Sequence, residues 1–473
     1  MRMFTRTSWL VIAAVLVLAS GCALMSPTDP YAGMARGLWP YSSGGSQPAT
    51  FQPVEGPLTL DEAIRVALVN NPEAAAMAHD VEALESQCQV AGSQRWPSLH
   101  MAGGYNRYLD SQRLVAATEN GEAGVFSRDI FAGDLVISMP LFTGGRITSE
   151  IKAAELLQKA AEHRLARTRE ELVFNVSSTF YNILAQREVI ESLEFSRKAL
   201  QGHLKRVQDL IAVQKAANVD QLRTEVRLAD LKQRLMRERN VLAVQLRVLT
   251  NLLGLDRPEK PIEPTGELAF TKAVIPEIDQ ALLQAFEGRS DYLAARAALE
   301  AQAKAVDAAR GAQWPTISLQ GTYGGRWAVN TTDQPSGMDR SDDVGRIGVV
   351  VDIPLFEGGR ISARVRQEKA RLLAAQERLR RLELQIQLDV ETAVLNIASA
   401  AQRVEATEKA IEQAKESLRI EREKYELGKG AVVDVLDAQS ALLDSQTNYY
   451  RALADYNVAL AQFELATGKA GEK

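Results

Sequence analysis

The chain contains almost no cysteine, with only Cys22 and Cys88 among 473 residues. A scaffold held together by disulfide bonds is therefore excluded, because at most one bridge could form. Histidine is equally scarce, and no metal-ligand spacing links the four residues of this type, which are His79, His100, His163 and His203. We therefore expect no metal centre.

Aromatic residues make up only 6% of the chain, and no basic stripe with interleaved aromatics is present. The net charge of −5 is small, so nucleic acid is not an expected partner. The sequence also lacks a nucleophile elbow and a dinucleotide-binding fingerprint. An enzyme is consequently the least expected class of protein, and no cofactor is predicted.

No apolar run is long enough for a membrane-spanning helix, and the run over residues 9–18 follows two arginines. This arrangement predicts a secretory signal peptide over residues 1–21. Ala19-Ser20-Gly21-Cys22 resembles a bacterial lipobox, which implies that Cys22 is lipidated and becomes the mature N-terminus. A plain signal peptide cut near the same point is the alternative. Residues 22–57 are rich in proline and predict an extended tether.

The sequence is internally duplicated. Trp96-Pro97 recurs as Trp314-Pro315, 218 residues later, and Pro140-Leu141-Phe142 recurs as Pro354-Leu355-Phe356, 214 residues later. Matching motifs at nearly constant distance indicate two copies of one structural unit. We expect a first copy, a second copy and an irregular segment between them, over residues 58–254, 277–468 and 255–276.

Each copy contains two amphipathic strands, expected at about 98–109 and 130–141, and at about 316–327 and 346–356. Along the third, apolar residues such as Ile317 alternate with polar ones, which is typical of a strand with one wet face. Alternation alone also fits a soluble sandwich, but the strand length and the aromatic residues at the strand ends favour a lipid-facing strand. Four strands cannot close a barrel and an open edge cannot face lipid, so we expect other subunits to complete it.

A very long helix follows each strand pair. Residues of about 145–212 and 359–426 contain no proline and almost no glycine, and each predicts a helix of about 100 Å. In the second, a seven-residue apolar series ends at Ile386 and another begins at Val390. Such a displacement by four residues is a stutter in a coiled coil. Each long helix turns back, which gives two antiparallel hairpins at 145–253 and 359–467.

This order of elements resembles the TolC-type outer-membrane efflux family over nearly all of residues 58–468. The most specific match is Tyr425-Glu426-Leu427-Gly428, followed by Val432 to Gln439, close to the family's signature at the inner tip of the second hairpin. The resemblance implies a mixed α and transmembrane-β fold. In a homotrimer, each chain would contribute four strands to one 12-stranded β-barrel, continued through the periplasm by an α-helical coiled-coil tunnel.

The resemblance also implies the function, localisation and partners. The chain would be a passive channel, an outer membrane factor lipoprotein held in outer-membrane lipid and extending into the periplasm. Its substrates would come from an inner-membrane pump through a periplasmic adaptor protein. A coiled-coil adaptor or a structural lipoprotein is the alternative. An adaptor would have one hairpin and a structural coiled coil would not need the strand pairs, so the duplication favours the channel.

Asp434 and Asp437 are the candidate residues of the pore constriction. They lie three residues apart and therefore share one face of a helix. In a threefold assembly, six such carboxylates would form a ring that favours cations at the narrow periplasmic end. The alternative is that both acids simply offset the dipole of a helix N-terminus.

Asp220 and Tyr425 are candidate gating contacts, because the resemblance implies bonds between the two hairpins that keep the tip closed. Asp220 stands in the first copy where Asp434 stands in the second. The family's basic partner is absent, because Gly430 occupies its position. The residues that could replace it are Lys429 and Lys215.

Overall fold

The computed structural model describes residues 57–214, 216–256, 262–274 and 276–470, which all lie in one unit, Val54–Lys473. The expected signal peptide, the lipidation site at Cys22 and all but the last residue of the tether lie outside the described residues. In the described part of the chain, no helix is both long enough and apolar enough to cross a membrane.

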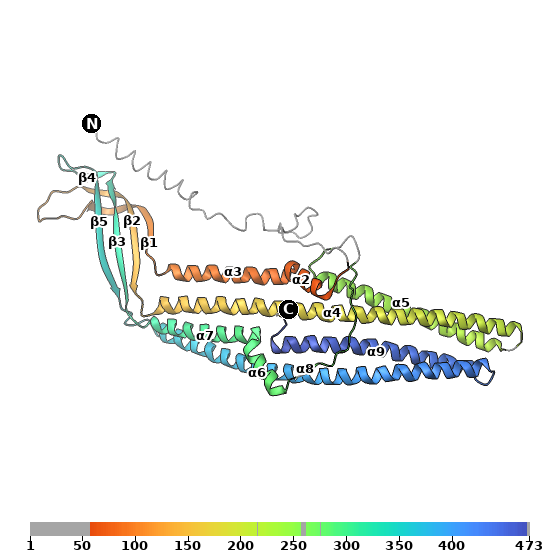
Figure 1. Ribbon diagram of the computed structural model, residues 1–473. Coiled ribbons are helices and arrows are strands. Elements are labelled where there is room, and N and C mark those ends of the chain that lie inside the picture. Colours follow the sequence, from red (N-terminus) through yellow and green to blue (C-terminus); the bar gives the residue numbers. More distant parts are fainter. Residues whose placement is uncertain (1–56, 215, 257–261, 275, 471–473) are drawn as a thin grey trace. The chain divides into compact units, whose positions relative to one another are not determined.

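The helices and strands follow the same order twice (Figure 1). The first copy consists of α2 (Leu60–Asn70), α3 (Pro72–Ser93), β1 (Ser98–Arg113), β2 (Phe126–Phe142), α4 (Arg146–Ala212) and α5 (Asn218–Leu252). The second copy consists of α6 (Ile278–Gly288), α7 (Ser290–Gly311), β3 (Thr316–Ala328), β4 (Thr331–Asp333), β5 (Ser341–Asp352), α8 (Arg360–Glu426) and α9 (Val432–Thr467).

Side-chain caps start the first two helices. The Thr59 hydroxyl accepts a hydrogen bond from the backbone N–H of Glu62 at 3.3 Å, which places Thr59 at the N-cap of α2. The Asn71 carboxamide oxygen accepts from Glu73 N–H at 2.9 Å and starts α3, with Pro72 in the first turn. The amide nitrogen of Asn71 also donates to the carbonyl of Leu252 at 2.9 Å. The cap of α3 therefore fixes the end of α5.

Glycine makes an equivalent joint possible in each copy. Gly254 follows α5 with φ 65°, and a Cβ atom there would lie 2.2 Å from the carbonyl oxygen of Asn70. Gly468 follows α9 with φ 78°, and a Cβ atom there would lie 2.5 Å from the carbonyl carbon of Gly288. Only glycine combines this backbone conformation with such close approach. The returning helix of each hairpin therefore ends against the junction between its copy's two short helices.

The strands of both copies form one antiparallel sheet in the order β1-β2-β3-β5, and short β4 pairs with β2 (Figure 1). The central β2–β3 pair joins the two copies, with Phe131 opposite Trp327 and Gly133 opposite Gly325. The outer sides of β1 and β5 have no pairing strand among the described residues. The sheet of one chain is therefore open at both edges.

The strand bounds differ from those predicted. β1 continues to Arg113 and β2 begins at Phe126, because their polar ends remain paired past a register shift after Arg107. β5 runs over Ser341–Asp352, earlier than expected, because its acidic start pairs with β3 although it lacks apolar alternation. Short β4 was not predicted.

One face of the sheet is apolar and exposed in the single chain. Its exposed side chains come from every long strand and include Leu99, Met101, Leu135, Tyr323, Ile347 and Val349. The opposite face holds an ion pair between Arg326 and Asp134, with the nitrogen and oxygen 2.8 Å apart. A continuous exposed apolar face of this kind marks contact with lipid or with another protein.

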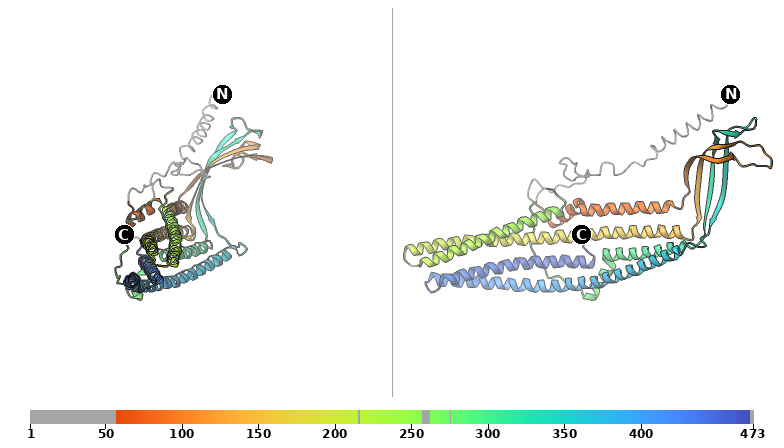
Figure 2. Two further views of the ribbon diagram at one scale, coloured as in Figure 1. Left: turned by 90° about the vertical axis from the view of Figure 1, so that its right-hand side faces the viewer. Right: turned by 180° about the vertical axis from the view of Figure 1, so that it is seen from behind.

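The helices form a single layer that changes partners along its length (Figure 2). Near the sheet, α4 packs between α3 and α7, and α7 packs on α8. Farther away, α4 packs between α5 and α9, and α9 packs on α8. The outer members are α3 and α5 on one side and α8 on the other. The helical layer is therefore open along two sides, as the sheet is.

The predicted stutter coincides with this change of partner. Ile386 and Val390 are fully buried with alanines of α6 and with Ala466 at the end of α9. Farther along α8, Ile397 and Val404 are buried against α9. The apolar face of α8 must rotate where its neighbour changes from α7 to α9, and a four-residue step in the heptads provides that rotation.

The described part of the mid-body segment, residues 262–274, connects the hairpins. Gly266 lies against side chains of α4, and Phe270 packs on Tyr456 of α9 with ring centroids 4.9 Å apart. The Tyr456 hydroxyl donates to the carbonyl of Thr271 at 2.7 Å and accepts from Ala273 N–H at 2.9 Å. The segment is thus held by hydrogen bonds rather than by regular secondary structure.

Candidate functional site

The tip of the second hairpin is a tight loop between α8 and α9. Gly428 adopts φ 69°, and the N–H of Lys429 donates to the carbonyl of Lys424 at 2.8 Å. A Cβ atom at Gly430 would lie 3.0 Å from the Lys424 Cβ and 3.1 Å from the backbone nitrogen of Tyr425. This loop therefore leaves no room for a basic side chain at Gly430 unless the backbone shifts.

Asp434 lies in the first turn of α9, and its side chain is exposed. One carboxylate oxygen accepts a hydrogen bond from the N–H of Ala431 at 3.3 Å. The Asp434 N–H donates to the Ala431 carbonyl at 3.2 Å. The carboxylate therefore stabilises the start of the helix, as the alternative interpretation expected. Its pore-lining role stays a prediction.

Asp437 is engaged by the other hairpin. Its Oδ1 atom lies 3.1 Å from Nη2 of Arg227 on α5, and both side chains are largely exposed. Asp434 and Asp437 lie on neighbouring turns, as their spacing predicts, yet only Asp437 contacts the first hairpin through an ion pair. The sequence did not identify Arg227 as its partner.

Tyr425 is half-buried at the end of α8 and packs on the core shared by α4, α5 and α9. Its ring lies 5.5 Å from the ring of His203, centroid to centroid. Burial raises the pKa of the Tyr425 hydroxyl, and the nearby carboxylate of Asp220 raises it further. The predicted residues Asp220 and Tyr425 are therefore neighbours, together with His203, which the sequence did not single out.

His203 favours its neutral form. Burial lowers its pKa, the positive charges of Arg422 and Arg206 lower it further, and Asp220 partly opposes them. The Nε2 atom is buried without a hydrogen-bond partner among the residues described. A proton on this ring would therefore place a second charge beside two arginines at the hairpin tip.

The two lysines considered as substitutes for the missing basic residue do not fill that role here. Lys429 makes no ion pair within the described residues, and Lys215 lies outside them. Instead, four other ion pairs join the hairpins. They are Arg227–Asp437 at 3.1 Å, Arg234–Asp444 at 3.4 Å, Arg451–Glu238 at 3.5 Å and Arg206–Glu426 at 3.0 Å.

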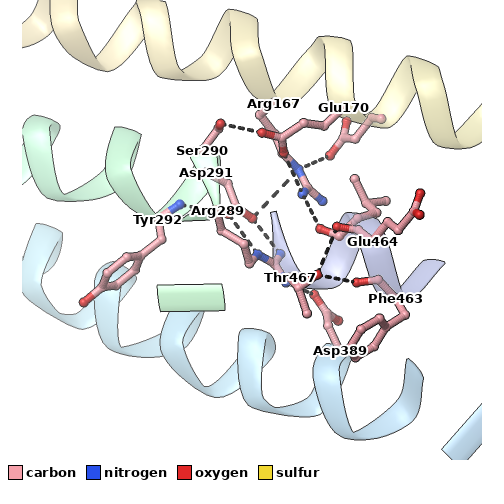
Figure 3. A network of polar contacts seen from close by, with 12 residues as sticks. Arg167, Glu170, Arg289, Ser290, Asp291, Tyr292, Asp389, Phe463, Glu464 and Thr467 are labelled. Carbon is pink, nitrogen blue, oxygen red and sulfur yellow. Dashed lines mark hydrogen bonds and ion pairs between the residues drawn. The ribbon is translucent and has the colours of Figure 1, made fainter. Parts of the chain in front are cut away.

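A buried polar network lies at the junction of α6 and α7 (Figure 3). The Arg289 side chain is only 3% exposed and donates from Nη2 and Nε to both oxygens of Asp291, at 2.7 and 3.0 Å. Its Nη1 donates to Asp389 of α8 at 3.0 Å. The Ser290 hydroxyl donates to Glu170 of α4 at 2.5 Å. Four helices are thereby fixed to one another at this level.

Charge and burial oppose one another in this network. Burial raises the pKa of Glu170, and the hydrogen bond from Ser290 and the charge of Arg167 only partly compensate. Burial would also raise the pKa of Asp291, but the bonds from Arg289 and its charge outweigh this, so its pKa is lowered. The arginine is therefore the charge that keeps this junction ionised.

The glycines after β2 and before α8 form the joints between strand and helix. Gly145 and Gly359 immediately precede the long helices and adopt φ 78° and φ 81°. The arginine after each glycine is engaged locally, since Arg146 binds Glu150 at 3.1 Å and Arg360 binds Glu357. These glycine pairs therefore shape a turn in the backbone.

Comparison with known proteins follows from this geometry. The sequence pattern of the family described as outer membrane efflux protein matches residues 63–255 and 281–469. Outer membrane protein TolC of Vibrio cholerae is 23% identical over 417 residues, covering 88% of this chain and 91% of that protein. Outer membrane protein OprJ of Pseudomonas aeruginosa is 26% identical over 455 residues, covering 91% and 89%. The crystal structure of the Campylobacter jejuni CmeC outer membrane channel superimposes with a TM-score of 0.75 at 17% identity, covering 87% of this chain and 86% of that chain.

Proposed function

The chain belongs to the outer membrane efflux protein family, and we propose that it is the outer-membrane channel of a tripartite export system. It provides a passive duct across the outer membrane and the periplasm. A periplasmic adaptor and an inner-membrane pump deliver the substrate, and the pump supplies the energy. The channel itself makes and breaks no bonds. Cys22 carries the lipid that anchors the N-terminus to the outer membrane.

One observation carries this proposal: the sheet and the helical layer are open along matching sides. β1 follows α3, and the outer side of each has no neighbour among the described residues. β5 leads into α8, whose outward face exposes Leu384, Leu388 and Leu395. A strand edge cannot remain unpaired in lipid, because no water is available to its backbone groups. The β5 edge of one copy therefore pairs with the β1 edge of the next.

The helices favour the same closure. α5 exposes a stripe of apolar side chains that includes Val226, Met236, Val244 and Val248. Exposed apolar stripes on two-sided helical layers are buried when copies pack side by side. Closure with three copies gives the homotrimer, in which twelve strands form a barrel and the helices form a tunnel. Its barrel presents the apolar sheet face to outer-membrane lipid.

We assign Asp434 to the narrow periplasmic end of this tunnel, together with Asp437 whenever Arg227 releases it. Rings of carboxylates attract cations and repel anions. Asp220 and Tyr425 lie at the same tip, where an iris-like movement of the hairpins opens the duct. The lowered pKa of His203 supports a tip that packs tightly at neutral pH.

Two measurements on the full-length protein in detergent test the proposal. Unheated samples should migrate as a trimer on denaturing gels and boiled samples as a monomer. In planar bilayers the channel should conduct cations selectively, and Asp434→Ala combined with Asp437→Ala should reduce that selectivity and the block by divalent cations. A water-soluble monomer that carries no current would refute the channel. A conducting double variant with unchanged selectivity would refute the aspartate ring alone.

A further inference from the structure

Two ion pairs between α5 and α9 repeat at the spacing of a heptad. The Arg227 guanidinium binds Asp437 at 3.1 Å and the Arg234 guanidinium binds Asp444 at 3.4 Å. The two arginines are seven residues apart on α5, and the two aspartates are seven apart on α9. Residues seven apart lie on one helix face, about 10 Å apart along the axis. The two pairs therefore form successive rungs between the returning helices of the two hairpins.

A third rung of reversed polarity follows them. Arg451 of α9 lies 3.5 Å from Glu238 of α5, and Gln186 of α4 donates to the same carboxylate group at 2.7 Å. The side chain of Glu238 is largely shielded, whereas that of Arg451 is half exposed. The ladder, defined as Arg227–Asp437, Arg234–Asp444 and Arg451–Glu238, thus extends away from the tip along both helices.

The ladder spans a place where the two helices hardly touch. α9 packs mainly on α4 and α8, and it makes little direct contact with α5. A small cavity opens between them, lined by Arg227, Arg234, Gln439, Leu436 and neighbouring residues. Gln439 closes its floor by donating to the carbonyl and the hydroxyl of Ser196, at 3.2 and 3.3 Å. Long arginine side chains can release across such a gap without exposing the apolar core.

We propose that this ladder is the latch that holds the two hairpins in the closed arrangement, in place of a basic residue at Gly430. This inference rests on the proposed channel function. The tip loop has no space for a side chain at Gly430, and Lys429 makes no ion pair among the residues described. Asp437 belongs to the latch in the closed state. When the rung breaks, its carboxylate joins Asp434 at the pore, so opening itself raises the cation preference.

The magnitude follows from the number of rungs that one opening step breaks. A single exposed ion pair shifts an equilibrium by roughly two-fold. Two arginine rungs in each of three chains make six pairs that separate together. Their combined loss therefore raises the ratio of open to closed channels by about 60-fold. Screening has the same origin, since the Debye length falls from about 10 Å at 0.1 M salt to about 3 Å at 1 M.

Planar bilayers with the full-length trimer test the latch. Arg227→Gln combined with Arg234→Gln should raise the open-to-closed ratio by about 60-fold and abolish its increase with salt. The matched control is Arg223→Gln combined with Arg237→Gln. These arginines are exposed on the same helix and make no ion pair among the described residues, and the net charge changes equally. The control should gate as the wild type does.

A charge exchange protects the test against misfolding. Arg227→Asp with Asp437→Arg and Arg234→Asp with Asp444→Arg reverses both rungs, and this variant should assemble and regain the closed state. Equal gating of the ladder variant and its control would overturn the latch, as would a charge exchange that assembles but stays open. Absence of current from the wild type and every variant would instead overturn the channel function, and the latch with it.

Discussion

The buried arginine at the α6–α7 junction offers the sharpest test of how the helices are held together. Arg289→Met keeps most of the side-chain volume but removes the charge that faces Asp291 and Asp389. Breaking a buried ion pair from one side typically costs 3–5 kcal/mol, because the remaining charge stays behind. The two carboxylates are 22% and 34% exposed, so water can reach them in part. We therefore expect a loss near 3 kcal/mol.

That loss should appear as a modest shift of the melting temperature. Unfolding entropies of about 2.1 cal/mol/K per residue give close to 0.9 kcal/mol/K for a unit of this size. A loss of about 3 kcal/mol then lowers the midpoint by about 3–4 °C. The assay is circular dichroism of the detergent-solubilised protein at pH 7.5, with a fixed scan rate because unfolding of large assemblies is often irreversible.

A matched control separates the network from charge alone. Arg310 pairs with Asp307 at 3.6 Å on the surface of α7, and its side chain is 53% exposed. Arg310→Met should therefore lower the midpoint by less than about 1 °C. Adding Asp291→Asn and Asp389→Asn to Arg289→Met should recover most of the loss, since no unpaired charge remains.

The pH dependence gives a second, independent sign. In the wild type the pKa of Asp291 is lowered, so its contribution is present above the ordinary carboxyl pKa near 4 and is lost as the pH falls through the folded value. In Arg289→Met, burial without the arginine raises that pKa, and the penalty should shrink as the pH falls. An Arg289→Met variant as stable as Arg310→Met at every pH would refute the role of the network.

Two further predictions concern the joint after α5 and the hairpin tip. Gly254→Ala should destabilise the protein by more than about 2 kcal/mol, because positive φ is combined with a backbone clash, whereas Gly428→Ala, with equal φ and open space, should cost about 1 kcal/mol; equal melting shifts would contradict this. Because the folded pKa of His203 is lowered, stability of the tip is complete above the ordinary histidine pKa near 6.5 and is lost as the pH falls below it. Amide hydrogen exchange at the end of α4 should therefore rise from pH 7.5 to pH 5.5, beyond its intrinsic change, and His203→Gln should remove that excess.

The long elements could be predicted because their patterns are themselves physical requirements. A helix of 67 residues needs an unbroken apolar face, and the heptads of α8 mark that face, including the step at Ile386 and Val390. Strand ends were harder, since β1 and β5 continue where backbone pairing persists but apolar alternation has stopped. Alternation reports contact with lipid or core, and it does not report pairing.

The contacts between hairpins could not be predicted from one sequence. Arg227 and Arg234 are two of many exposed charges on α5, and their heptad spacing matches Asp437 and Asp444 only at one axial offset between the helices. That offset is set by the tip loops and by the joints at Gly254 and Gly468, whose geometry depends on tertiary contact. Periodicity identified each partner surface but could not align the two surfaces.

The unpaired edges of β1 and β5 have a consequence for genetics. If each ring needs every member to supply both edges, one faulty copy breaks the whole circle of strands. Equal expression of an intact gene and a gene with a damaged β5 edge would then leave roughly one ring in eight free of faulty members. Missense alleles in that strand should accordingly behave as dominant, while null alleles of the same gene remain recessive.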